Sequence, residues 1–243
     1  MKEKLVAVVF LITFSGCASQ AQFSSGLGKI LSGVQKSGGS LSEADVVEGL
    51  KEALTVGVSN GSAEASKVDG FFKNELIKIA VPPEAQKVAE TLRKMGLGDE
   101  VDKFTLALNR AAEDAAKKSK PIFVKAVTSM TITDALGILK GQDDAATQYL
   151  RKTTNQDLFN TFFPVVDSTL KQNKATQYYA DIVNTYNQIP LVKKVNPNLK
   201  EYATQKTIDG LYLLIAQEEK KIREDPVARV SDLLKKVFGQ AGK

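Results

Sequence analysis

The fold class follows most directly from residues 99–116, which read DEVDKFTLALNRAAEDAA. Apolar side chains recur in this segment three or four positions apart, at Val101, Phe104, Leu108, Ala111 and Ala115. Because an α-helix completes a turn about every 3.6 residues, this spacing gathers them on one face. The segment is therefore predicted to be a helix that packs one apolar face against a core and stops before Pro121.

Helical spacing continues on both sides of this segment, and strand-like alternation is nearly absent from Ser42 onward. Ser42 and Asp45 form a capping-box-like start, which predicts a first helix that ends at residues 60–61, Asn-Gly. Pro83 suits the first turn of a second helix, which Gly96 closes. Further helices are expected to begin near residues 121, 133, 143, 155, 176, 198 and 226.

These segments together predict an all-α fold, a single compact multi-helix bundle of about eight or nine helices in residues 41–243. The helix over 198–225 is expected to be the longest. Pro164 is expected to kink the helix that contains it, because proline removes a main-chain donor. Residues 76–81 are the only candidate for extended structure, since they lead into a proline.

Composition restricts the chemistry that this chain can perform. The 243 residues are 43% hydrophobic and 25% charged, which is typical of a globular protein. The chain has no His, no Trp and one Cys. These counts exclude a His-dependent catalytic triad, a His or multi-Cys zinc site and an internal disulfide. No glycine-rich phosphate loop is present, so we expect no cofactor and no metal.

The N-terminus resembles the signal sequence of a bacterial lipoprotein. Lys2 and Lys4 precede an apolar run at 5–12 that is too short to span a bilayer as a helix. Small residues then precede Cys17, although Phe14 stands where leucine is usual. Residues 1–16 are therefore predicted to be a lipoprotein-type signal peptide, with Cys17 as the lipidation site. The alternative is a conventional secretory signal beside an unrelated cysteine.

Residues 17–40 are rich in Ser, Gly and Gln, as expected of a flexible tether behind the lipidated cysteine. Ala18 and Ser19 follow Cys17 without an aspartate, a start that resembles outer-membrane lipoproteins. We therefore expect an exported protein at the periplasmic face of the outer membrane, held by a lipid anchor at Cys17. Without residues 1–16 the chain has 31 basic and 27 acidic residues, a net charge of +4. This charge is mild and dispersed, so nucleic acid is not an expected partner.

Several short motifs are distributed over most of the chain. They are the segments at 41–57, 80–83, 109–113, 121–123, 133–141, 144–150 and 209–219. As a set they resemble the family called domain of unknown function 4197, over nearly all of residues 41–240. The resemblance implies a small exported bacterial protein, often with a lipoprotein-type signal, and it implies no settled activity.

Candidate ligand-binding residues come from polar positions at helical spacing and from a polar patch interleaved with glycine at 133–147. Three groups qualify: Asn109, Arg110 and Glu113; Asp209, Glu219 and Arg223; and Asp134, Asp144 and Thr147. If the first two groups faced one another inside the bundle, they would form a small polar cavity. The alternative is that they are surface ion pairs or buried structural salt bridges. For Asp144 and its neighbour Asp143, capping of a helix N-terminus is the alternative.

These observations favour a lipid-anchored envelope protein that binds or scaffolds and does not catalyse. Its partner would be an envelope protein or a small molecule. The enzymatic alternative is a carboxylate-dependent hydrolase that acts on cell-wall glycan, with acids such as Glu113 and Glu219. A third interpretation is a purely structural envelope protein without a small ligand.

Overall fold

The structure is a computed structural model that describes residues 42–188, 194–195 and 198–225. All described helices belong to one compact unit, Leu41–Lys243. The predicted signal peptide, Cys17, the tether and the helix expected from residue 226 lie outside the described residues. The unit contains its own extensive apolar core.

The described residues contain eight α-helices and one 3-10 helix, and none of these residues forms a strand. The all-α prediction is therefore confirmed. In chain order the elements are α2 (Glu43–Ser66), η1 (Pro83–Ala85), α3 (Gln86–Lys94), α4 (Gly98–Ala116), α5 (Ser119–Thr128), α6 (Ile132–Leu139), α7 (Ala145–Gln172), α8 (Ala175–Asn187) and α9 (Leu199–Glu224).

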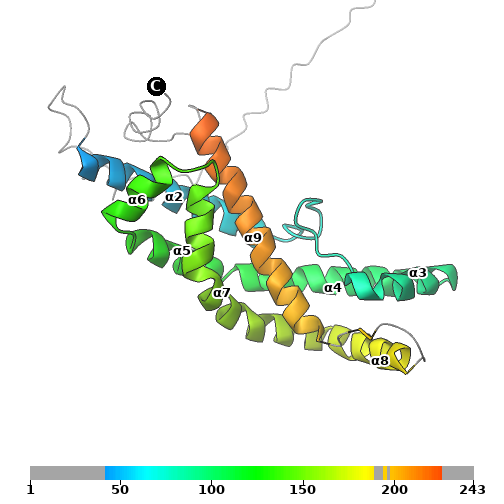
Figure 1. The fold of residues 1–243 in the computed structure, drawn as a ribbon. Helices are drawn as coiled ribbons and strands as arrows, with labels where there is room; N and C mark the ends of the chain where they lie inside the picture. The colour runs from blue at the N-terminus through cyan, green and yellow to red at the C-terminus, as the bar shows by residue number, and fades with distance from the viewer. Residues whose placement is uncertain (1–41, 189–193, 196–197, 226–243) are drawn as a thin grey trace, which may run out of the picture. The chain divides into compact units, whose positions relative to one another are not determined.

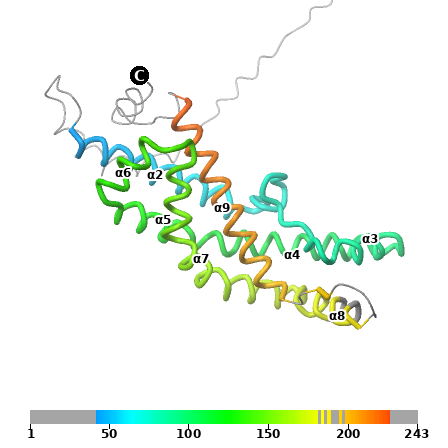
Figure 2. Tube along the Cα trace, in the orientation of Figure 1, coloured from blue at the N-terminus to red at the C-terminus, as the bar shows by residue number. Residues whose placement is uncertain are grey.

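The core lies where α2, α4, α5, α7 and α9 meet. Figure 1 shows α9 crossing the unit diagonally, and α9 packs mainly against α7 and α2. The Cα trace shows α3, α4 and α8 at one end of the unit and α6 at the other (Figure 2). The largest fully buried side chains include Tyr212, Phe71, Phe123, Phe162 and Leu108. Burial of such side chains is the main favourable contribution to folding.

Two helix boundaries differ from the sequence prediction. Helix α2 continues through residues 60–61 to Ser66, although its predicted capping box at Ser42 and Asp45 is present. Gly61 allows close packing there, because a Cβ at this position would lie only 3.2 Å from Cγ1 of Ile215 in α9. Helix α7 is continuous through residues 154–155 and contains Pro164, so α7, with 28 residues, is longer than α9 with 26.

The connection between α2 and η1, residues 67–82, is neither helix nor strand. It begins with a turn in which Asp69 has a left-handed φ of 65°. Gly70 follows, and a Cβ there would lie 2.3 Å from the main-chain oxygen of Glu64. Residues 76–77 lie in a turn and residues 78–81 form no strand, so the strand considered for 76–81 is absent. The connection covers one side of α4, where it bonds Asn109 and Glu113.

Gly210 of α9 provides a test of how closely this connection packs on α9. A Cβ at Gly210 would lie 2.8 Å from Cε1 of Phe71 and 3.2 Å from Cβ of Ile77. We expect Gly210→Ala to lower the free energy of unfolding by about 1–3 kcal/mol, because overpacking forces neighbours to move. Chemical denaturation of both chains measures the difference.

Gly137 of α6 is the matched control for this substitution. A Cβ at Gly137 has nothing within 4 Å. Alanine favours a helix interior over glycine, so Gly137→Ala should stabilise the protein by about 0.5–1 kcal/mol. Equal effects of the two substitutions would contradict the close packing at Gly210.

No single helix among the described residues has the length and apolar composition required to span a membrane. Helices α5 and α6 satisfy that requirement only jointly, across a bend of 103°.

Candidate functional site

Asn109 of α4 is fully buried and binds the main chain of residue 79. Its side-chain oxygen accepts a hydrogen bond from the Ile79 N–H at 2.8 Å. Its Nδ2 donates to the Ile79 carbonyl at 2.9 Å and to the Thr105 carbonyl at 2.8 Å. A buried amide with three such bonds fixes the position of a main chain that has no helical partners of its own. Asn109 therefore holds the 67–82 connection against α4.

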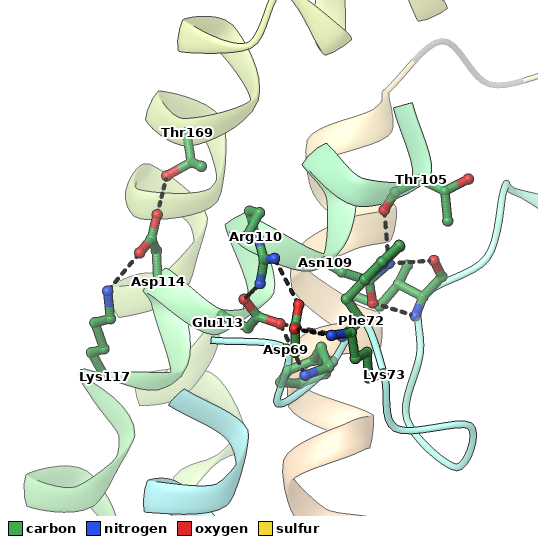
Figure 3. A network of polar contacts seen from close by, with 12 residues as sticks. Asp69, Phe72, Lys73, Thr105, Asn109, Arg110, Glu113, Asp114, Lys117 and Thr169 are labelled. Atoms are coloured by element: carbon green, nitrogen blue, oxygen red, sulfur yellow. Dashed lines mark hydrogen bonds and ion pairs between the residues drawn. The ribbon is translucent and has the colours of Figure 1, made fainter. Parts of the chain in front are cut away.

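Glu113, one helical turn further along α4, binds the same connection (Figure 3). Its Oε1 accepts hydrogen bonds from the N–H groups of Phe71 and Phe72, at 3.1 and 3.2 Å. Its Oε2 accepts a hydrogen bond from Nη1 of Arg110 at 2.5 Å. The buried carboxylate thus has a cation and two main-chain donors, which offset the cost of removing it from water.

Arg110 joins Glu113 to Asp69 (Figure 3). Its Nη2 donates to Oδ1 of Asp69 at 2.7 Å, and Lys73 pairs with the other oxygen of Asp69 at 2.8 Å. Lys73 and Arg110 lower the pKa of Asp69 below its usual value. Glu113 and Asp69 in turn raise the pKa of Arg110. The cluster of Asp69, Lys73, Arg110 and Glu113 is therefore charged, paired and electrically neutral.

Glu219 of α9 forms a second, separate cluster at the start of α7. Its carboxylate accepts hydrogen bonds from the N–H groups of Ala146 and Thr147, at 3.0 and 2.9 Å, and from the Thr147 hydroxyl at 2.8 Å. Arg223 donates to the same carboxylate from Nη2 at 2.8 Å, and to the Ile138 carbonyl at 3.0 Å. Glu219 thus supplies the acceptor that the first turn of α7 requires.

Asp144 and Asp134 occupy positions at helix N-termini. Asp144 is the N-cap residue of α7, but its side chain accepts a hydrogen bond from Gln148 Nε2 at 2.8 Å and none from the cap N–H groups. Capping, the alternative given for Asp144, is therefore wrong for its side chain, and Glu219 performs that role from another helix. Asp134 completes a capping box with Thr131, and the Thr131 hydroxyl lowers the pKa of Asp134.

Asp209 lies apart from both buried clusters. It pairs with Nη1 of Arg151 at 3.2 Å, and both side chains are 41% exposed. The Arg151 guanidinium stacks over the Tyr212 ring at 4.4 Å, and the Tyr212 hydroxyl hydrogen-bonds to Thr154 at 2.8 Å. Asp209 is therefore a partly exposed partner of an arginine that covers a buried tyrosine.

The predicted site residues do not converge on one polar cavity. Asn109, Arg110 and Glu113 are brought together with the 67–82 connection, whereas Thr147, Glu219 and Arg223 are brought together at the start of α7. Phe71, whose N–H binds Glu113, packs on Gly210, and Glu219 lies nine residues further along α9, roughly 13 Å by helical rise. Their contacts correspond to the alternative of buried structural salt bridges. Glu113 and Glu219 are consequently not a facing pair of acids.

An apolar pocket of about 630 Å³ lies among α3, α4 and α8, on residues outside the predicted set except Arg110. Phe104 of α4 and Tyr179 of α8 line it, with their rings stacked 5.8 Å apart. Burial raises the pKa of Tyr179 to about 12, so its hydroxyl is neutral at physiological pH. Two of the lining residues, Leu97 and Tyr178, are 44% and 57% exposed. The pocket therefore has an aromatic wall and an apolar rim that reaches the surface.

Helix α3 forms one wall of this pocket and has no buried residue. Its apolar side chains, Val88, Ala89 and Leu92, all line the pocket. An ion pair between Arg93 and Asp102 ties α3 to α4 on the outside. The apolar face of α3 thus points at a space that no other described side chain fills.

Sequence reasoning missed both Asp69 and the pocket. The dipeptide at residues 69–70, Asp-Gly, is a recognised turn signal and marks where the chain folds back on α4. The pocket has no comparable local signal, because its wall consists of ordinary apolar helix faces. Among the described residues, no group of three or more His, Cys, Asp or Glu side chains is arranged to hold a metal ion.

Comparison with known protein families shows which family the chain resembles. A family model described as "Protein of unknown function (DUF4197)" matches residues 40–239. No curated protein and no solved structure matches the chain.

Proposed function

The chain belongs to the DUF4197 family, and from this premise we propose that it is a lipid-anchored binding module of the cell envelope that takes an apolar ligand between α3, α4 and α8. The pocket is the observation that carries this proposal. Its volume of about 630 Å³ falls within the range of small-molecule sites. The proposed location in the cell envelope rests on the N-terminal sequence, with its short apolar run before Cys17.

The distribution of polar contacts supports binding through the pocket. Glu113 and Glu219 already accept two main-chain hydrogen bonds each and pair with arginines. Groups engaged in this way stabilise the fold and have little capacity left for a ligand. The apolar wall of α3 has the opposite character, since it lines space and is covered by nothing described. A ligand there would bury surface that water otherwise contacts.

Native mass spectrometry of residues 18–243, purified from the periplasm of a native-like host, tests the proposed binding. We expect a co-purifying apolar compound on the wild-type chain and its loss in Leu92→Asp. Because α3 contains no buried residue, this substitution places a charge in the pocket without opening the core.

Leu213→Asp is the matched control, because Leu213 is a 41% exposed leucine on α9 and does not line the pocket. This variant should keep the compound. Equal retention by both aspartate variants would show that the compound binds elsewhere, and the proposed pocket function would then be wrong.

The proposed anchor is tested by growth with a clickable fatty acid. The full chain should acquire the label and partition into membranes, whereas Cys17→Ser should carry no label, because Cys17 is the only cysteine. A wild-type chain that carries no label would overturn the anchor and leave the binding proposal to its own test.

A further inference from the structure

The charged groups around the pocket indicate which end of a ligand they would contact. Three lining residues carry charge: Glu100, Lys103 and Arg110. Glu100 and Lys103 pair with each other at 2.8 Å and are 60% and 70% exposed, so they form an ordinary surface pair. Arg110 is only 33% exposed and lies where the pocket meets the 67–82 connection. It is therefore the charged group best placed to act on a bound ligand.

The Arg110 guanidinium is held in place by two carboxylates, and some of its N–H groups have no acceptor among the described residues. A guanidinium has five N–H groups. One bonds Glu113 and one bonds Asp69, which leaves three without an acceptor among the residues that the structure describes. The two carboxylates fix the orientation of the guanidinium, and the Phe72 ring lies 5.9 Å from it. An acceptor on a ligand would thus meet donors that are already oriented.

A second cation lies beside the aromatic ring next to Arg110. It is Lys78, and the hydrogen bond from Arg93 together with the charge of Lys78 lowers the pKa of Asp102. Lys78 Nζ lies 4.9 Å from the same Phe72 ring that Arg110 approaches. A planar carboxylate matches the fork geometry of a guanidinium better than a point acceptor does.

We infer that the ligand is an amphiphile with a long hydrocarbon chain and a carboxylate head, an inference that rests on the proposed pocket function. The chain lies against Phe104, Tyr179 and the apolar face of α3. The carboxylate accepts hydrogen bonds from the unused N–H groups of Arg110. The apolar rim at Leu97 and Tyr178 lets such a molecule enter from the surface.

Three ligands with the same hydrocarbon chain test this inference: laurate, dodecanol and dodecylammonium. Isothermal titration calorimetry on residues 18–243 gives the three values of Kd, with laurate and dodecylammonium kept below their micelle concentrations and dodecanol below its solubility limit. We expect laurate to bind at least about tenfold more tightly than either other ligand, since a hydrogen bond to a charged group is worth that factor or more.

Variants locate the head group. Arg110→Gln should reduce laurate binding to the level of dodecanol and leave dodecanol binding unchanged. Unchanged dodecanol binding also shows that the pocket is intact in this variant. Lys103→Gln, which removes the exposed cation of the same pocket, should keep the preference for laurate. Leu92→Asp should abolish binding of laurate and dodecanol alike.

The outcomes separate the inference from the proposed function. If all three ligands bind equally, the carboxylate inference is wrong and the pocket function stands. If Arg110→Gln keeps the full preference for laurate, Arg110 is not the head-group contact and the inference is equally overturned. If Leu92→Asp leaves laurate and dodecanol binding unchanged, or if no ligand binds, the pocket function itself fails.

Discussion

Replacing Glu219 with leucine is expected to lower the free energy of unfolding by about 3–5 kcal/mol, because breaking a buried ion pair by removing one partner is strongly destabilising. The Glu219 side chain is 4% exposed and that of Arg223 is 13% exposed. The substitution also removes the acceptor for the N–H groups of Ala146 and Thr147 at the start of α7. Both losses act at the same place, where α6, α7 and α9 meet.

Urea denaturation followed by circular dichroism measures this loss. The control is Glu224→Leu on the same helix, where Glu224 is 60% exposed and pairs with Lys220 at 3.8 Å. That variant should change the free energy of unfolding by less than about 1 kcal/mol. The double variant Glu219→Leu with Arg223→Leu should recover part of the stability, because replacing both partners of a buried ion pair by apolar residues costs less than removing one of them. A Glu219→Leu chain as stable as its control would contradict the role assigned to this carboxylate.

Replacing Asn109 with leucine is expected to destabilise the protein by at least about 2 kcal/mol. Leucine has a similar size, so the loss comes from the buried N–H and carbonyl of Ile79, each of which costs about 1–3 kcal/mol when left without a partner. The Thr105 carbonyl, the third partner of Asn109, lies inside α4, where the main chain of the helix can still supply its hydrogen bond. The expected damage is therefore concentrated in the 67–82 connection.

Amide hydrogen exchange distinguishes this local effect from a general loss of stability. The Ile79 amide should exchange faster in Asn109→Leu by a larger factor than amides of the α7 core, such as that of Leu158. Asn160→Leu is the control, because Asn160 is exposed on α7 and bonds the side chain of Gln156. Uniform acceleration of all amides would show that Asn109 has no specific hold on the connection.

The sequence predicted the fold class because helical periodicity and capping motifs are local properties. The Ser42 and Asp45 box is an example, since both of its partners lie within one turn. The end of α2 was mispredicted because Gly61 reads locally as a stop, whereas its actual role depends on Ile215, far along the chain. Local sequence patterns do not reveal which distant helix packs closely on a glycine.

For the candidate site, too, contacts within one helix were predictable from the sequence and contacts between distant segments were not. Helical spacing placed Arg110 and Glu113 together, and the structure confirms their contact. Their partner Asp69 lies 41 positions away from Arg110, and no periodicity connects the two. The pocket was unpredictable for a different reason. The apolar faces of α3, α4 and α8 resemble core faces, and only their packing shows that the space between them stays open.

Helix α3 also bears on how a ligand would reach the pocket. A nine-residue helix without a fully buried residue is held by its packing on α4, by its ion pair to α4 and by its neighbours in the chain. Short helices of this kind are marginal by themselves in water. Its separation from α4 would cost less free energy than unfolding of the core, so local opening of this one wall would widen the entrance at the rim that Leu97 and Tyr178 form. The residence time of the ligand would then be set by the opening rate of α3, and any compound that fills the space would slow its own release by ordering the helix.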